Sequence, residues 1–188
     1  MDLVQRAQDI LLKPKETGPA IAAEPGDAAS LYSNYLIYLA LVPAVAGFIG
    51  RMLLGSYGFH VRMPIVSGLI SAVVGYVMSL VVVYVLSLIA NALARNFGGT
   101  KDPLMALKLV VYASTAGFVG GVFGITPQTA ALGVLASLYS IYLIYTGVPV
   151  LMKCPPEKAG PFTAVLVVCG FVVSMLTVAM SGMHSGGF

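Results

Sequence analysis

Charged residues are scarce in this sequence. Only 9% of the 188 residues are Asp, Glu, Lys or Arg, whereas 59% are hydrophobic and the mean hydropathy is +0.94. A typical soluble domain has about 25% charged residues. The composition therefore excludes a water-soluble globular protein. The formal net charge of +3 is small and the basic residues are spread along the chain, which argues against nucleic acid as a partner.

The residue types that build metal and proton-transfer sites are also few. Cys154 and Cys169 fall at different predicted depths, so we expect free thiols and no disulfide framework. His60 and His184 are predicted on the opposite side of the membrane from Cys154, which leaves no four-ligand metal site. None of the seven carboxylates falls within a long apolar run, so a carboxylate proton relay has no support.

Motifs of nucleotide-binding or hydrolytic enzymes are missing as well. The chain has no glycine-rich phosphate loop with a lysine. No serine has a histidine and a carboxylate predicted on the same side of the membrane and at the same depth, as a nucleophilic hydrolase site would require. We therefore expect a non-enzymatic protein that uses no cofactor and no metal.

Long apolar runs take up most of the chain. Each is about as long as the roughly 20 residues that a helix needs to cross a bilayer. The predicted spans are residues 31–54, 65–93, 104–123, 129–152 and 162–183. The predicted fold class is all-α, a polytopic integral membrane bundle of five transmembrane helices. We expect two parts, a cytoplasmic segment over residues 1–29 and a transmembrane domain over residues 30–188.

The first 29 residues differ in character from the spans. Residues 2–12, DLVQRAQDILL, place most apolar side chains on one face, which predicts a short amphipathic helix at the membrane interface. Three prolines in residues 13–25 favour an extended or turning linker over a continuous helix. We expect this segment to contribute to the surface that partners meet and not to the membrane core.

The distribution of basic residues predicts the orientation in the membrane. Eight lie on one side, and only Arg51 and Arg62 lie on the other. The eight are Arg6, Lys13, Lys15, Arg95, Lys101, Lys108, Lys153 and Lys158. By the positive-inside rule, their side and the N-terminus are cytoplasmic and the C-terminus is outside. The same residues form the predicted cytoplasmic interface, and Lys108, one turn inside the third span, is expected to snorkel to the surface.

Small residues mark two predicted helix-packing faces. In the second span they recur every four residues, and in the third span they form GxxxG pairs before a turn at residues 124–127. The positions are Ser67, Ser71, Gly75, Ser79, Gly117, Gly120, Gly121 and Gly124. Close packing of helices is the favoured interpretation, with a pore lining or a bend as the alternative. Assembly into a homo-oligomer is left open.

A group of polar side chains is predicted in the cytoplasmic half of the bundle. Its members are Asn91, Tyr112, Ser114 and Thr115. Buried hydrogen bonding between helices is the favoured interpretation, and a small-molecule or lipid site is the alternative.

A short similarity links the first and fourth spans. Residues 31–38 read LYSNYLIY and residues 138–145 read LYSIYLIY, with seven of eight positions identical. The two spans run in opposite directions, as inverted repeats do in transporters. Chance or a shared packing requirement is the favoured explanation. The tyrosines of both spans fall in the cytoplasmic half, which predicts a tyrosine-rich layer there.

Three stretches, in this order, resemble the bacterial branch of the Yip-one domain family, named for Ypt/Rab-interacting proteins. They are LVQRAQDILLKPKETGPAIAAEP at the start, KDPLMALKLVVYASTAGFVGGVFGI in the third span and LASLYSIYLIYTGVPVLMKCPPEKA in the fourth. The resemblance implies a five-helix domain of a bacterial cytoplasmic membrane with a cytoplasmic N-terminus. In eukaryotic relatives it implies a role in vesicle traffic with prenylated Rab-type GTPases, and it leaves the bacterial function open.

The expected function follows from these features. We expect a membrane-trafficking or membrane-organisation protein whose cytoplasmic face meets membrane lipids or a protein partner. The alternative is a small transporter or channel for an ion, a lipid or a small molecule. In that case the small residues of the second span and the glycines of the third span would line the path.

Overall fold

The computed structural model describes residues 3–54, 65–126 and 128–185 and confirms the predicted all-α membrane bundle. Five helices in these residues are long and apolar enough to cross a membrane. The first span consists of α3 (Ala28–Leu31), η1 (Tyr32–Leu36) and α4 (Ile37–Leu54). The second consists of α5 (Ile65–Ala94) with η2 (Arg95–Phe97), and the third consists of α6 (Pro103–Gly120) with η3 (Gly121–Ile125). The fourth is α7 (Ala130–Leu151), and the fifth is α8 (Pro156–Ser185). His60, Arg62 and Pro127 lie outside the described residues.

Local chemistry explains where the spans begin. The Asp102 carboxylate accepts hydrogen bonds from the backbone N–H groups of Leu104 and Met105 at 2.9 and 3.1 Å and so caps α6. Asp27 caps α3 through a reciprocal capping box with Ser30. Pro156 begins α8 well before the predicted start at residue 162, because a proline fits the first turn of a helix, where its missing N–H is not needed.

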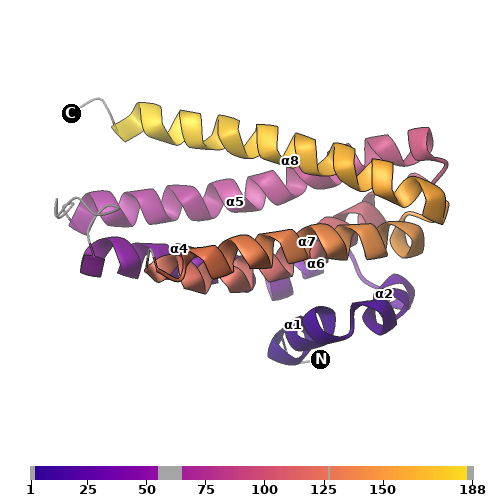
Figure 1. Ribbon diagram of the computed structural model, residues 1–188, viewed down its shortest axis with the longest axis horizontal. Coiled ribbons are helices and arrows are strands. Elements are labelled where there is room, and N and C mark those ends of the chain that lie inside the picture. Colours follow the sequence, from indigo (N-terminus) through magenta and orange to yellow (C-terminus); the bar gives the residue numbers. More distant parts are fainter. Residues whose placement is uncertain (1–2, 55–64, 127, 186–188) are drawn as a thin grey trace.

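The third span forms the centre of the bundle. Eleven of the eighteen residues of α6 are buried, against five of the thirty residues of α5. In Figure 1, α6 and α7 run side by side, while α5 and α8 lie together in another layer. Val66 and Val168 show that the outer faces of α5 and α8 carry exposed apolar side chains, as lipid contact requires.

Two of the predicted glycines allow helices to approach closely. At Gly120 a side chain would collide with Ala136 of α7, and at Gly121 an added Cβ would lie 2.5 Å from the Cβ of Pro43 in α4. The Gly117 N–H donates a hydrogen bond to the Ser140 hydroxyl at 3.0 Å. Gly124 differs, because among the described residues none beyond its chain neighbours lies within 4 Å of the place where its Cβ would be.

The small-residue stripe of α5 does not face protein along its first half. Ser67, Ser71 and Gly75 are exposed on this chain, and the Ser71 hydroxyl donates to the carbonyl of Ser67 in the same helix at 2.9 Å. Only Ser79, further along, is partly buried. The expected packing of these first positions within the bundle is wrong, because both sides of α5 are apolar and the neighbouring helices select another face.

The N-terminal segment forms two helices, α1 (Leu3–Leu12) and α2 (Pro14–Ala23). The expected linker over residues 13–25 is therefore wrong. Pro14 takes the first position of α2, where proline is tolerated, and the exposed Pro19 lies within the helix. Packing of α2 against α7 holds the segment in helical form.

These two helices lie beside the end of the bundle that holds the α5–α6 and α7–α8 connections (Figure 1). We call it the basic end, because it holds six of the predicted interface cations as exposed side chains: Lys13, Lys15, Arg95, Lys101, Lys153 and Lys158. The two connections touch where the Thr100 N–H donates to the Met152 carbonyl at 2.9 Å. Ile10 and Ile21 belong to the same buried cluster as α6. The N-terminal segment is thus part of the core, contrary to the expectation that it adds only to the surface.

Candidate functional site

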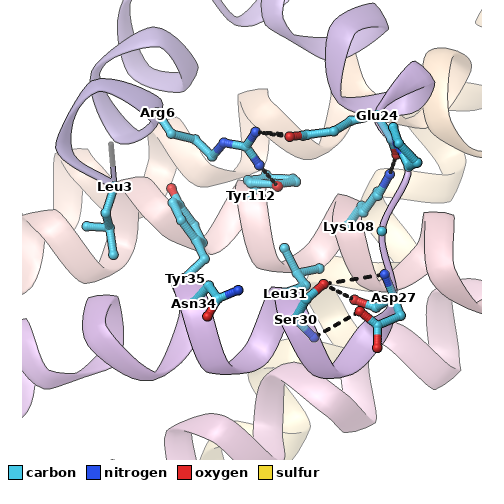
Figure 2. Close-up of a pocket in the computed structure, with 12 residues that line it drawn as sticks. Leu3, Arg6, Glu24, Asp27, Ser30, Leu31, Asn34, Tyr35, Lys108 and Tyr112 are labelled. Carbon is cyan, nitrogen blue, oxygen red and sulfur yellow. Dashed lines mark hydrogen bonds and ion pairs between the residues drawn. The ribbon is translucent and has the colours of Figure 1, made fainter. Parts of the chain in front are cut away.

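A polar pocket of about 210 Å³ lies where the N-terminal helices meet the first and third spans (Figure 2). We call it the N-terminal pocket. α1, the α2–α3 connection, the start of the first span and α6 all contribute to its wall. The lining residues are Leu3, Arg6, Glu24, Pro25, Gly26, Asp27, Ser30, Leu31, Asn34, Tyr35, Lys108 and Tyr112.

Lys108 is buried in the wall of this pocket, with 4% of its surface exposed. Its ammonium group donates hydrogen bonds to the carbonyls of Ile21 and Glu24 at 2.9 and 2.7 Å. These carbonyls lie at the C-terminal end of α2, where the helix dipole favours a cation. The expectation that Lys108 snorkels to the surface is wrong, because the two carbonyls hold its ammonium group in the interior of the chain.

Arg6 connects α1 with both the α2–α3 connection and α6. One of its terminal nitrogens donates to the two carboxylate oxygens of Glu24 at 2.5 and 2.6 Å, and the other donates to the Tyr112 hydroxyl at 2.6 Å. Partial burial lowers the pKa of Arg6, but the hydrogen bond to Glu24 and the charges of Tyr112 and Glu24 outweigh this effect, so its pKa is raised overall. Arg6 therefore remains a cation at every physiological pH.

Tyr35 links two members of the predicted polar cluster. Its hydroxyl shares a hydrogen bond with the Thr115 hydroxyl at 2.9 Å, and its ring lies 5.2 Å from that of Tyr112. Ser114 takes no part, because its hydroxyl donates to the Val110 carbonyl of its own helix at 2.7 Å. Asn91 lies on α5, and its side-chain oxygen is buried without a hydrogen-bond partner among the described residues. The cluster thus comes together only in part.

Residues that the sequence did not single out complete the pocket. Tyr35 comes from the repeated LYSNYLIY stretch, and its place in that stretch was the available signal. Asn34 lies in the same stretch, whereas Glu24 gave no signal, because its contacts with Arg6 and Lys108 depend on how the N-terminal segment folds back onto the bundle. Asp27 also lies in the wall, and hydrogen bonds from Ser30 lower the pKa of its carboxyl.

Other tyrosines of the first and fourth spans contact neighbouring elements. Tyr32 packs edge-on against Tyr84 of α5 with ring centroids 6.5 Å apart. Tyr139 of α7 packs on Tyr142 and donates a hydrogen bond to the Leu11 carbonyl at the end of α1, at 2.7 Å. The tyrosines of the first and fourth spans therefore hold different elements in place.

The helical spans and the polar pocket at one end define a polytopic helical membrane protein. The Yip1 domain matches residues 9–178, and the chain belongs to the Yip1 domain family. It is similar to the inner membrane protein YohC of Escherichia coli strain K12 and to that of Escherichia coli O6:H1 strain CFT073. Identity is 24% over 156 residues in both cases, covering 80% of this chain and 80% of the relative. No solved structure matches the chain significantly.

Proposed function

We propose that this protein is a non-enzymatic protein of a bacterial cytoplasmic membrane that presents its basic end to a protein partner in the cytoplasm. The orientation is supported by the eight basic residues predicted on one side, against two on the other. The relatives, which are inner membrane proteins by name, support the location.

The exposed face of α1 carries this proposal. Leu12 and Val4, two turns apart, are 78% and 59% exposed, although α1 lies outside the spans and turns Ala7 and Ile10 toward the bundle. Lys13 and Lys15 follow Leu12 in the chain and are also exposed. Apolar side chains with cations at one end of the helix fit a partner that has an apolar contact patch with acidic side chains beside it.

The transporter or channel alternative has less support from the described residues. Ala136 and Pro43 occupy the space beside Gly120 and Gly121, and the first half of the small-residue stripe of α5 lies on the outer surface of the bundle. These two features therefore do not share a path through the bundle.

The test is to place a photocrosslinking residue at position 12 of the full-length chain in living cells. We expect one discrete protein adduct, which Lys13→Glu with Lys15→Glu should reduce several-fold. The matched control is position 168, where Val168 is 62% exposed on α8 and should yield only lipid adducts. Adducts with lipid alone at position 12 would show that α1 faces the membrane and would overturn the proposal.

A further inference from the structure

The N-terminal pocket is lined by the first turns of two membrane spans. Ser30, Asn34 and Tyr35 come from the first turns of the span Ala28–Gly50, and Lys108 comes from the second turn of the span Pro103–Ile125. Both spans begin at the basic end. A ligand in this pocket therefore meets the interface between the hydrocarbon core and water.

One side of the pocket can hold an anion. The buried Lys108 has three N–H donors, of which two are used by backbone carbonyls, and no carboxylate of the described residues lies within 4.0 Å of it. A buried ammonium without a carboxylate partner is stabilised by any anionic oxygen that reaches it. Arg6 lies in the same wall, where its guanidinium group is paired with the Glu24 carboxylate, as Figure 2 shows.

The same wall also offers a carboxylate that can hold a cation. The Asp27 carboxylate lines the pocket, whereas both oxygens of the Glu24 carboxylate already accept hydrogen bonds from Arg6. With Arg6 and Glu24 paired, Lys108 and Asp27 leave one cation and one carboxylate for a ligand, which fits a zwitterion better than a simple anion. The volume of about 210 Å³ is below the roughly 300–1,000 Å³ of pockets for drug-sized ligands, so it accommodates a headgroup and not a whole lipid.

We propose that the N-terminal pocket binds the headgroup of a phospholipid that carries a primary amine, of the phosphatidylethanolamine class. The phosphate lies toward Lys108 and the ammonium toward Asp27. This inference goes beyond the docking of a protein on α1, and either can fail without the other.

Native mass spectrometry of the full-length chain in mild detergent tests the assignment. We expect phosphatidylethanolamine to bind about tenfold more tightly than phosphatidylcholine, whose trimethylated nitrogen cannot donate hydrogen bonds, and than phosphatidylglycerol, which has no amine. Lys108→Gln should weaken binding about tenfold, while Lys101→Gln, an exposed lysine outside the pocket, should leave it unchanged.

A second variant keeps the test valid if Lys108→Gln does not fold. Gly26→Leu places a side chain in the mouth of the pocket, and the first atom its Cβ meets is the Ser30 hydroxyl oxygen at an ordinary 3.8 Å. It should fold normally and lose the preference for phosphatidylethanolamine. Equal affinity for the three lipids, or unchanged binding in Gly26→Leu, would overturn the proposal. Equally tight binding of soluble glycerophosphoethanolamine would assign the pocket to a soluble phosphate ester instead of a lipid.

Discussion

A single buried ammonium group ties the N-terminal helices to the centre of the bundle. Lys108 donates to two carbonyls at the end of α2, and each hydrogen bond to a charged group contributes roughly 1.5–3 kcal/mol. The sequence showed a lysine one turn inside a span, for which snorkelling is the usual outcome. It could not show that residues more than eighty positions earlier would bring acceptors to it.

Glycines on the third span offer a direct test at the residue scale. Gly121→Leu should lower the free energy of unfolding by about 1–3 kcal/mol, because its Cβ would lie 2.5 Å from the Cβ of Pro43 and α4 would have to move. Thermal unfolding in detergent, followed by helical circular dichroism, measures the effect. Gly124→Leu is the matched control, since no described residue beyond its own chain neighbours lies within 4 Å of its Cβ position. Equal stability of the two variants would contradict the close contact of α4 with the third span.

At the scale of elements, the spans could be predicted and the N-terminal helices only in part. Each span was evident because the bilayer requires about 20 consecutive apolar residues, which few other structures need. The helix α2 was missed, since the prolines of residues 13–25 argue against a helix by local preference. Its stability comes from tertiary contacts instead: Ile21 is 5% exposed, and Arg6 pairs with Glu24 just after the helix ends.

Removal of residues 1–25 should therefore destabilise the bundle instead of leaving it intact. The truncated chain loses the buried side chains of Ile10 and Ile21 and leaves Lys108 without its two carbonyl partners. We expect a loss of at least roughly 2–5 kcal/mol, measured as a lower thermal midpoint in detergent.

Lys108→Met in the truncated chain separates the two causes. It removes the uncompensated ammonium while keeping an apolar side chain of similar length, so it should recover part of the lost stability. In the full-length chain the same substitution should destabilise, because the carbonyls of Ile21 and Glu24 lose their donor. Exposed Leu12→Ser is the control and should change the midpoint little. If truncation left the midpoint unchanged, α1 and α2 would be dispensable for the fold.

At the scale of the whole molecule, the arrangement of spans was harder to predict than their number. Lipid-facing and protein-facing surfaces of a membrane helix are both apolar, so hydropathy does not distinguish them. Small residues were the available signal. This signal correctly predicted helix contacts at Gly120 and Gly121. It wrongly predicted them at Ser67, Ser71 and Gly75, which are exposed.

The proposed orientation places the α5–α6 connection in the cytoplasm and the α6–α7 turn outside. The native Cys154 is a poor reporter of this arrangement, because it is only 3% exposed. Burial also raises the pKa of its thiol, with Lys158 lowering it in part, so the reactive thiolate forms only at a higher pH than for a free cysteine. A labelling test of the orientation therefore requires cysteines at exposed positions.

Lys101→Cys and Gln128→Cys provide these positions in a chain whose own cysteines are replaced by alanine. Both native residues are exposed, one in each connection, so the two variants form a matched pair. In spheroplasts, a membrane-impermeant maleimide should label Gln128→Cys at once and Lys101→Cys only after the membrane is permeabilised. The reason is that Lys101 and the other cations of the basic end face the cytoplasm under the positive-inside rule. Immediate labelling of Lys101→Cys together with protection of Gln128→Cys would show that the protein has the opposite orientation, with α1 and the N-terminal pocket outside the cell.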